Sequence, residues 1–302
     1  GSDMGGSLRN PAAWNNIYGF RPSQGLVPGG PGGELFMSQM GVEGPMARNV
    51  ADLALLLSVQ AGYEPGAPLS LGGVDTDFPT QLSRPLKGGR IAWLGDLGGH
   101  LATEDGVLAL CETALRSFEA VGLSVEAHVP DVDFERIWQA FVTLRHATSG
   151  CALKVHYDDP ARRPLLKPEA VWEIEGAIDL RAPEIHAASV VRSEWYEAVL
   201  RLFETYDFLA LPTAQVFPFS VDIHWPSEIA GRPMDSYHRW MEVTALATMA
   251  GCPAASLPAG FDARGRPMGF QLIGRPRRDA DVLRAAAAYE RHTGRGGGLQ
   301  IA

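Results

Sequence analysis

The chain opens with the sequence GSDMGGSLRNPAAW over residues 1–14, in which a serine directly follows two glycines. Gly5 and Gly6 allow backbone angles that other residues avoid, so that consecutive backbone N–H groups can point into one small space beside the Ser7 hydroxyl. Such a space could hold an oxyanion. We therefore interpret Ser7 as a nucleophile.

A short helix is predicted immediately after this loop. Asn10 is a favourable N-cap and Pro11 a favourable first helical residue, and the helix is expected to continue through Trp14. Its positive end would face the loop and stabilise negative charge that develops near Ser7. A plainer interpretation is that Ser7 only caps this helix, as serines near a helix start commonly do.

The opening residues carry a family resemblance. Residues 1–12 (GSDMGGSLRNPA), continuing through YGFRPSQG at 18–25, resemble the core of the amidase signature family, whose pattern reads G-[ST]-D-x-G-G-S-[IL]-R-x-P-A. The resemblance continues in GPMARNVADLALLL at 44–57 and in the strand-like DFLALPT at 207–213. The nucleophile elbow G-x-S-x-G of another hydrolase class fits less well, because Arg9 stands where its second glycine should be.

The resemblance implies a mechanism without a cofactor. Ser7 would attack an amide carbonyl, and the backbone N–H groups of Met4, Gly5, Gly6 and Ser7 would stabilise the tetrahedral oxyanion. The resulting acyl-enzyme would then be hydrolysed by water. Asp3 and Arg9 flank the loop with opposite charges, and we expect them to brace it as a structural pair, although both could instead be solvated.

A serine hydroxyl needs a base within hydrogen-bond reach. The resemblance implies a serine, a bridging serine and a lysine, and the last two precede the nucleophile in family members. The sequence therefore looks N-terminally truncated, and the chain alone is expected to be nearly inactive. Its three lysines, Lys87, Lys154 and Lys167, lack a Gly/Ser setting, so none is assigned as the base.

Other catalytic groups are possible alternatives. A conventional triad could combine Ser7 with His224 or His238 and with Asp222 or Asp235, but no spacing supports it, and a lone histidine is more often structural. The three cysteines, Cys111, Cys151 and Cys252, suit reduced thiols that are mostly buried.

Composition excludes several other classes of protein. The formal charge of −9 and pI near 5.4 argue against nonspecific nucleic-acid binding. No apolar run is long enough for a membrane span and no signal segment opens the chain, so a cytoplasmic location is expected. No histidine or cysteine spacing indicates a metal site.

The remaining pattern predicts an α/β fold. A strand at Arg90–Leu94, a helix starting at Thr103 or Asp105 and a strand at Leu123–Ala127 form a unit that requires parallel pairing. We expect one domain over residues 1–302, with a mixed sheet flanked by helices on both faces. A helical insert at about 133–206 would line the substrate side, although its aromatic residues, Trp138, Phe141, Trp172 and Trp195, could equally be plain core.

Helix ends and the tail complete the prediction. Asn49 is expected to cap a helix whose buried residues are Val50, Leu53, Leu56 and Leu57. Asp279 is expected to cap the last helix. The Gly-rich tail after Gly294 is expected to fray.

The favoured function is therefore hydrolysis of a carboxamide or an aryl or alkyl amide. One alternative is the glutaminase subunit of a transamidation complex, although its usual Asp-Gln-Ile-Gly-Pro-type stretch is replaced here by SQMGVEGP at 38–45. Another is a noncatalytic binding protein on the same scaffold. The amide substrate and the oligomeric state do not follow from the sequence.

Overall fold

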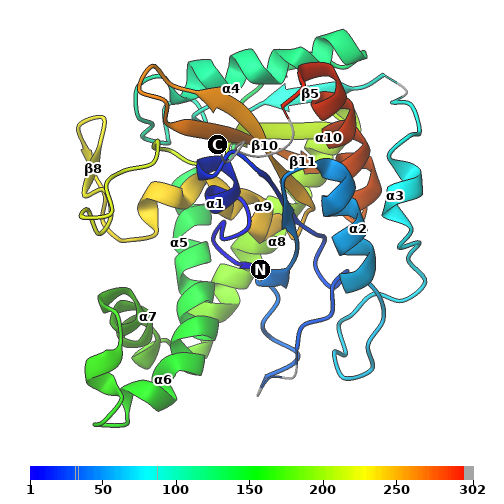
Figure 1. Cartoon of the computed structure of the whole chain (residues 1–302). Helices are drawn as coiled ribbons and strands as arrows, with labels where there is room; N and C mark the ends of the chain where they lie inside the picture. Colours follow the sequence, from blue (N-terminus) through cyan, green and yellow to red (C-terminus); the bar gives the residue numbers. More distant parts are fainter. Residues whose placement is uncertain (31, 33, 87, 296–302) are drawn as a thin grey trace. The chain divides into compact units, whose positions relative to one another are not determined.

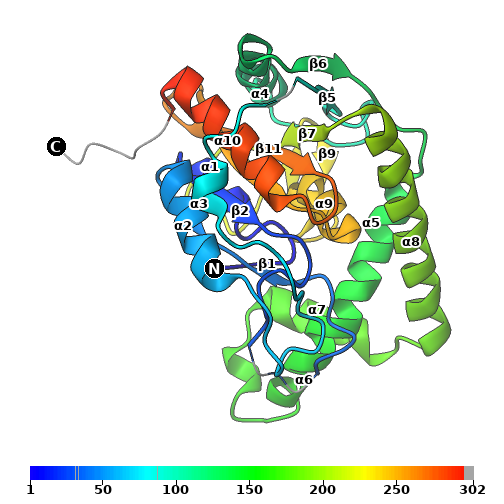
Figure 2. The same cartoon turned by 90° about the vertical axis from the view of Figure 1, so that its right-hand side faces the viewer.

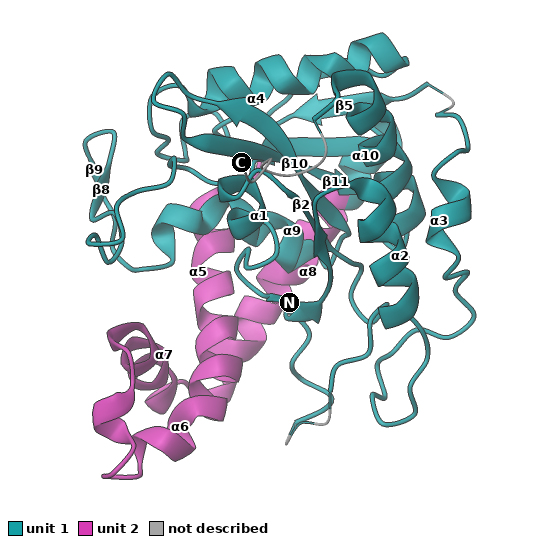
Figure 3. Cartoon of the chain, viewed as in Figure 1, with its two compact units in different colours: residues 1–130, 200–302 teal, residues 131–199 magenta. Residues whose placement is uncertain are grey.

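The computed structural model describes residues 1–30, 32, 34–86 and 88–295. These residues form two compact units, shown in different colours in Figure 3. Unit 1 comprises Gly1–Pro130 and Leu200–Ala302, and unit 2 comprises Asp131–Val199. Within the described residues, none of the helices combines the length and the apolar character needed to cross a membrane.

Unit 1 is built on a seven-stranded mixed sheet of order β4-β2-β10-β11-β7-β5-β6. β5 pairs in parallel with β6 and β7, and the other neighbours are antiparallel. The predicted parallel unit is thus confirmed. The strands are β2 (Tyr18–Arg21), β4 (Met46–Ala47), β5 (Arg90–Trp93), β6 (Ser124–Ala127), β7 (Phe208–Pro212), β10 (Ala254–Phe261) and β11 (Pro267–Gly274).

Two smaller sheets complete the strands of unit 1. β1 (Ser2–Asp3) pairs antiparallel with β3 (Val42–Glu43), and β8 (Glu228–Ile229) pairs with β9 (Arg232–Pro233). The pairing of β1 with β3 fixes the chain directly before the Ser7 loop, by which we mean residues 4–9.

The helices of unit 1 are shown in Figures 1 and 2. They are α1 (Asn10–Trp14), α2 (Val50–Gln60), α3 (Phe78–Gln81), α4 (Val107–Leu115), α9 (Ala245–Ala250) and α10 (Asp279–Thr293), with 3₁₀ turns η1 (Arg116–Val121) and η4 (Arg239–Thr244). The helix after β5 therefore starts a little later than its sequence suggested, at Val107.

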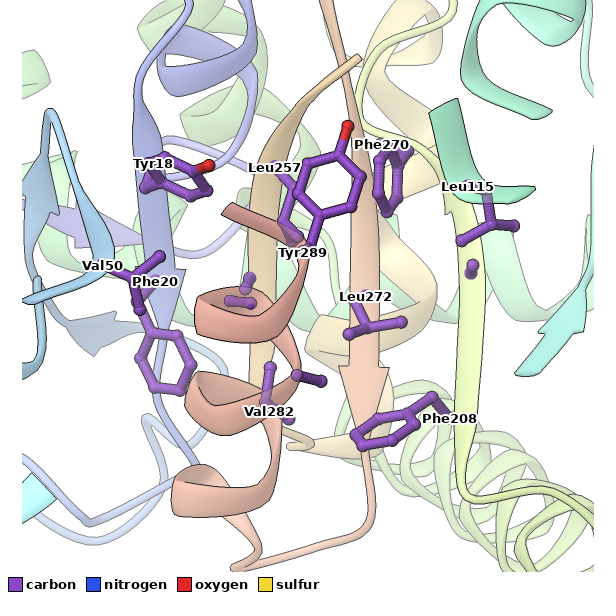
Figure 4. Packing of buried hydrophobic residues seen from close by; sticks show 14 of the residues in the cluster. Tyr18, Phe20, Val50, Leu115, Phe208, Leu257, Phe270, Leu272, Val282 and Tyr289 are labelled. Atoms are coloured by element: carbon purple, nitrogen blue, oxygen red, sulfur yellow. The ribbon is translucent and has the colours of Figure 1, made fainter. Parts of the chain in front are cut away.

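One face of the sheet is apolar. Alternate residues of β2, β10 and β11 pack against α2, α4 and α10, because side chains along a strand point to opposite faces in turn. Figure 4 shows α10 lying over these strands, and the labelled side chains that fill the space include Tyr18, Phe20, Leu257, Phe270, Leu272, Val282 and Tyr289.

The opposite face of the sheet carries α1. A Cβ atom added at Gly19 of β2 would lie 2.0 Å from the Leu8 carbonyl oxygen and 2.7 Å from the Ala12 side chain, so only glycine lets the chain around α1 come this close. Among the intervening strand residues on this face are two polar ones, Gln271 and Ser256, both fully buried. The sheet thus has helices on both faces, and it presents buried polar groups beneath the Ser7 loop.

Unit 2 is helical. It contains α5 (Phe134–Arg145), a π-helical turn η2 (His146–Gly150), α6 (Cys151–Tyr157), η3 (Arg163–Leu165), α7 (Pro168–Ile178) and most of α8 (Ala182–Thr205). Trp138, Phe141 and Trp195 are each at most 3% exposed, and the Trp138 and Phe141 rings stack with centroids 5.4 Å apart. These three rings therefore pack in a protein interior, and a substrate-lining role for unit 2 stays a prediction.

Several local predictions need correction. Asn49 does cap α2, since its side chain accepts a hydrogen bond from the Asp52 amide, but Leu56 is 41% exposed and lies off the buried face. Asp279 does not cap α10; its carboxylate accepts hydrogen bonds from the amide and hydroxyl of Ser23 instead. The cysteines are mostly buried, as expected, since Cys111 and Cys252 are buried and Cys151 is exposed. All but the first residue of the tail after Gly294 lies outside the described residues.

Candidate active site

Ser7 is exposed on a loop whose neighbours are buried. Gly5, Gly6, Leu8 and Arg9 are all buried, and the Ser7 hydroxyl makes no hydrogen bond within the residues that the structure describes. Ser7 does not cap α1 either, because that helix has no side-chain cap. Ser7 is therefore not a helix cap, and its role as a nucleophile stays a prediction.

The predicted cap at Asn10 is also wrong. α1 begins at Asn10 itself, with Arg9 as the preceding cap residue, and the Asn10 side chain donates to the Thr213 carbonyl at 2.6 Å. The turn into the helix is closed by backbone groups instead, since the Gly6 carbonyl accepts from the Arg9 and Asn10 amides at 2.8 and 2.7 Å. Asn10 therefore ties the helix start to the end of β7.

Asp3, the last residue of β1, holds the loop through its carboxylate. Its Oδ1 accepts from the Gly6 amide at 3.0 Å, and its Oδ2 accepts from the Leu8 amide at 3.1 Å. Arg9 donates through Nη2 and Nε to the two oxygens at 2.9 and 3.0 Å, and Arg21 adds a contact at 3.1 Å. Asp3 and both arginines are at most 1% exposed, so this is a fully desolvated charge cluster.

The charges in this cluster determine the state of Asp3. Burial by itself would raise the pKa of the carboxyl, but the Arg9 and Arg21 guanidiniums and the hydrogen bond from the Leu8 amide outweigh it and hold that pKa far below its usual range. Asp3 is thus a permanent anion that anchors two amides of the Ser7 loop.

Arg9 connects the loop to two distant elements. Its Nη1 donates at 2.8 Å both to the Thr244 carbonyl and to Gln271 Oε1, and its Nη2 donates to Thr248 Oγ1 at 3.1 Å. Gln271 on β11 is held in turn, because its Nε2 donates to the carbonyls of Pro212 and Val243. Arg9 therefore fixes the loop to β11 through Gln271, to η4 through Thr244 and to α9 through Thr248.

The Thr244 side chain contacts both glycines of the loop. Its Oγ1 lies 2.8 Å from the Gly5 carbonyl, within hydrogen-bond distance. Gly6 has φ +108, and a Cβ there would lie 2.2 Å from Asn10 Oδ1 and 2.7 Å from Thr244 Oγ1. Only glycine fits this position, both by backbone angle and by space.

The four backbone amides predicted to hold an oxyanion differ in whether they already donate a hydrogen bond within the protein. The Gly6 amide already donates to Asp3, so it is used within the loop. The Gly5 and Ser7 amides make no hydrogen bond in the described part of the chain and remain able to donate. The role of the Met4 amide stays a prediction. A cavity of about 350 Å³ lies at the Met4 end of the loop, and the residues that line it include Ser2, Asp3 and Met4.

The alternative catalytic groups gain no support. Neither His224 nor His238 is hydrogen-bonded to Ser7 among the described residues. Cys252 is fully buried, and burial raises the pKa of its thiol to about 12, so it stays protonated. Lys154 pairs with Asp158 in unit 2, and Lys87 lies outside the described residues. No group of three His, Cys, Asp or Glu side chains in the described chain could hold a metal ion.

Four residues of this network were not predicted from the sequence: Arg21, Thr244, Thr248 and Gln271. Each contacts Asp3 or the loop from a position at least 18 residues away. Their spacing along the chain carries no periodic signal, and only a polar residue inside an otherwise apolar strand, as at Gln271, could have pointed to them.

Fold and loop together define the class of protein. The sequence profile described as "Amidase" matches residues 1–283. The chain therefore belongs to the amidase signature family, and its seven-stranded sheet with helices on both faces is the fold of its structural neighbours in that family.

Individual proteins that this chain resembles include acylamidases and an amidotransferase subunit. The chain is 32% identical to an acylamidase of Rhodococcus erythropolis, over 96% of this chain and 60% of the relative. It is also 32% identical to a glutamyl-tRNA(Gln) amidotransferase subunit of Thermus thermophilus, over 98% of this chain and 64% of the relative. A solved bacterial aryl acylamidase superposes with a TM-score of 0.88 at 29% identity, over 97% of this chain and 61% of that one. The chain thus spans about 60% of the length of these proteins.

Proposed function

We propose that this chain carries the nucleophile and the oxyanion donors of an amide hydrolase. The observation that carries the proposal is the exposed Ser7 hydroxyl between buried neighbours, on a loop fixed through Asp3 and Arg9. Such rigidity matters because a nucleophile displaced by about 1 Å can lose about a hundredfold in rate. Membership of the family and the acylamidase relatives support the same reaction.

The proposed reaction has two steps. Ser7 Oγ attacks the amide carbonyl carbon, and the developing oxyanion accepts hydrogen bonds from the Gly5 and Ser7 amides, with Met4 as a further donor. The C–N bond then breaks, the amine leaves with a proton, and an ester joins the acyl group to Ser7. Water hydrolyses that ester and restores the hydroxyl.

The proton that leaves Ser7 needs an acceptor. Since no described residue is hydrogen-bonded to its hydroxyl, we assign the base to the lysine and bridging serine that the family resemblance implies, which precede the nucleophile in family members. The 302-residue chain alone should then turn over an amide at least about a thousandfold more slowly than a form that includes those two residues. Comparable turnover by the two forms would contradict this assignment.

Hydrolysis of an aryl amide tests the proposal. In the protein expressed from its own gene, p-nitroaniline release from p-nitroacetanilide should fall at least about a thousandfold in Ser7→Ala. Ser83→Ala, which removes an exposed hydroxyl on another part of the chain, should keep full activity. Retention of more than about a tenth of the activity by Ser7→Ala would refute the assignment of Ser7.

A second candidate is ammonia release from glutamine, because the transamidase relative is as similar in sequence as the acylamidase is. The stretch at residues 38–45 departs from the sequence usual for that role. We expect glutamine to give no Ser7-dependent ammonia under conditions in which the aryl amide is cleaved. Ser7-dependent ammonia release, with the aryl amide left intact, would favour the transamidase function.

A further inference from the structure

A second cavity, of about 530 Å³, lies in unit 1 away from the Ser7 loop. It is situated where β7 begins, where β11 ends and where α10 begins. Asn10 of the active-site helix contacts Thr213, just past the other end of β7, and five steps of extended strand separate Thr213 from Phe208 by about 16 Å. The cavity is therefore a separate site on the same sheet.

Arginines dominate the polar part of its wall. The cavity is lined by Arg84, Arg275, Arg278 and Arg284, against two carboxylates, Asp207 and Asp281. Four positive charges against two negative ones leave a local charge of about +2 on a chain whose formal net charge is −9. The cavity is therefore positively charged although the protein as a whole is acidic, and its positive charge favours an anionic ligand.

The guanidinium groups retain unused donors. Asp281 accepts from Arg278 Nε at 2.7 Å and from Arg284 Nη2, and Asp207 lies 3.4 Å from Arg275 Nη2. Each guanidinium carries five N–H groups, so these contacts engage only part of them. Within the described residues, Arg284 Nε is buried and has no hydrogen-bond partner, and the Arg84 side chain makes no hydrogen bond or ion pair. A buried unpaired donor costs free energy that a ligand oxygen would recover.

The segment that carries two of these arginines is held in place. Arg277 has φ +62, a left-handed angle that is unfavourable for this residue, and its amide donates to Ser23 Oγ at 3.0 Å. Ser23 in turn donates through its hydroxyl and its amide to the buried Asp279 at 2.6 and 2.7 Å. The backbone that carries Arg275 and Arg278 on either side is therefore held in place.

We propose that this cavity binds a small organic molecule through a phosphate or diphosphate group. Planar guanidinium groups pair with phosphate oxygens in a bidentate manner, and the N-terminus of the fifteen-residue α10 adds its positive end. Pro85, Leu86 and Phe208 line the same cavity and supply an apolar surface for the organic part of the ligand. The site is independent of the proposed hydrolysis at Ser7.

Binding of inorganic pyrophosphate to the 302-residue chain tests the proposal by isothermal titration calorimetry in about 0.15 M salt, where nonspecific attraction is screened. We expect one saturable site, weakened about tenfold or more by Arg284→Gln and by Arg84→Gln, because each removes charged donors to phosphate. Arg264→Gln, at an exposed turn outside the cavity, changes the net charge equally and should leave the affinity within about twofold.

Absence of saturable binding up to about 10 mM pyrophosphate would overturn the proposal, and so would equal weakening by Arg264→Gln. If Arg284→Gln fails to fold because Asp281 loses a partner, Arg84→Gln decides alone, since the Arg84 side chain is exposed and its loss disturbs no described contact. Unchanged affinity in Arg84→Gln would then contradict the site.

Discussion

At the scale of single residues, Asp3 determines the shape of the Ser7 loop. Its two oxygens accept from two loop amides and two guanidinium groups, all shielded from water. A buried charge cluster of this kind contributes little net stability compared with apolar packing, but removing one partner is costly because the others stay buried and unpaired. Asp3 therefore contributes more to the geometry of the Ser7 loop than to the net stability of the fold.

Asp3→Asn should consequently lower the free energy of unfolding by about 3–5 kcal/mol, because Arg9 and Arg21 would stay buried without their anion. Urea unfolding followed by circular dichroism measures this loss. Asp222→Asn removes an exposed carboxylate and serves as the control, with an expected change below about 0.5 kcal/mol.

The Asp3→Asn variant also tests how the stability of the folded protein depends on pH. Because the pKa of Asp3 in the folded protein lies far below its ordinary value of 3.8, its contribution to stability is complete above about pH 4 and is lost as the pH falls further. The wild-type urea midpoint should therefore decline below pH 4 more steeply than that of Asp3→Asn. Parallel declines in the two proteins would exclude Asp3 as a source of acid sensitivity.

Residues close together in the sequence were the predictable part of this site. Ser7, its glycines, Asp3 and Arg9 lie within seven positions, and local backbone chemistry with a known pattern identifies them. Arg21, Thr244, Thr248 and Gln271 could not be predicted, because their hydrogen bonds to Asp3 or to the loop depend on how the fold brings distant segments together. Asn10 and Asp279 were misread as helix caps for the same reason, since tertiary partners occupy their side chains.

At the scale of secondary-structure elements, the sequence was most informative where a helix is stabilised locally. α2 begins where Asn49 predicts, since the Asn49 side chain accepts from the Asp52 amide at 2.7 Å. Its buried stripe was less predictable: Val50, Leu53, Ala54 and Leu57 are buried, whereas Leu56 is exposed although its hydrophobicity suggested otherwise. Hydrophobicity alone does not tell which side of an apolar helix has a neighbour.

Replacing the cap of α2 gives a prediction at this scale. Asn49→Ala should reduce the free energy of unfolding by about 1 kcal/mol, because the Asp52 amide loses its acceptor. Asn49→Ser retains an oxygen at the cap and should cost only a few tenths of a kcal/mol. Chemical denaturation measures both, and equal effects of the two substitutions would argue that the cap contributes nothing.

At the scale of the whole molecule, the sequence predicted the mixed sheet and its flanking helices, and the helical insert that it suggests at about 133–206 overlaps unit 2. Unit 2 has a polar cluster of its own. Glu173, 2% exposed, pairs with Arg145, and the His146 ring nitrogen Nδ1 lies 3.0 Å from the Glu173 carbonyl. This cluster joins α5 and η2 to α7.

Glu173→Ala should therefore loosen unit 2 selectively. Because Arg145 loses its buried partner, we expect faster amide hydrogen exchange, by about tenfold or more, across α5 and α7, with little change in β10 and β11 of unit 1. Glu175→Ala, at an exposed position of α7, is the control. Equal acceleration in both units would show that they open together as a single cooperative structure.

The central claim for the molecule is that Ser7 is a nucleophile and not a structural serine. A fluorophosphonate probe applied to the protein expressed from its own gene, followed by mass spectrometry of its peptides, tests this claim directly. The account predicts one adduct, on the peptide that contains Ser7, and none in Ser7→Ala. An unmodified Ser7 in a protein whose circular dichroism shows an intact fold, or an adduct on another serine, would contradict it and favour a noncatalytic binding role.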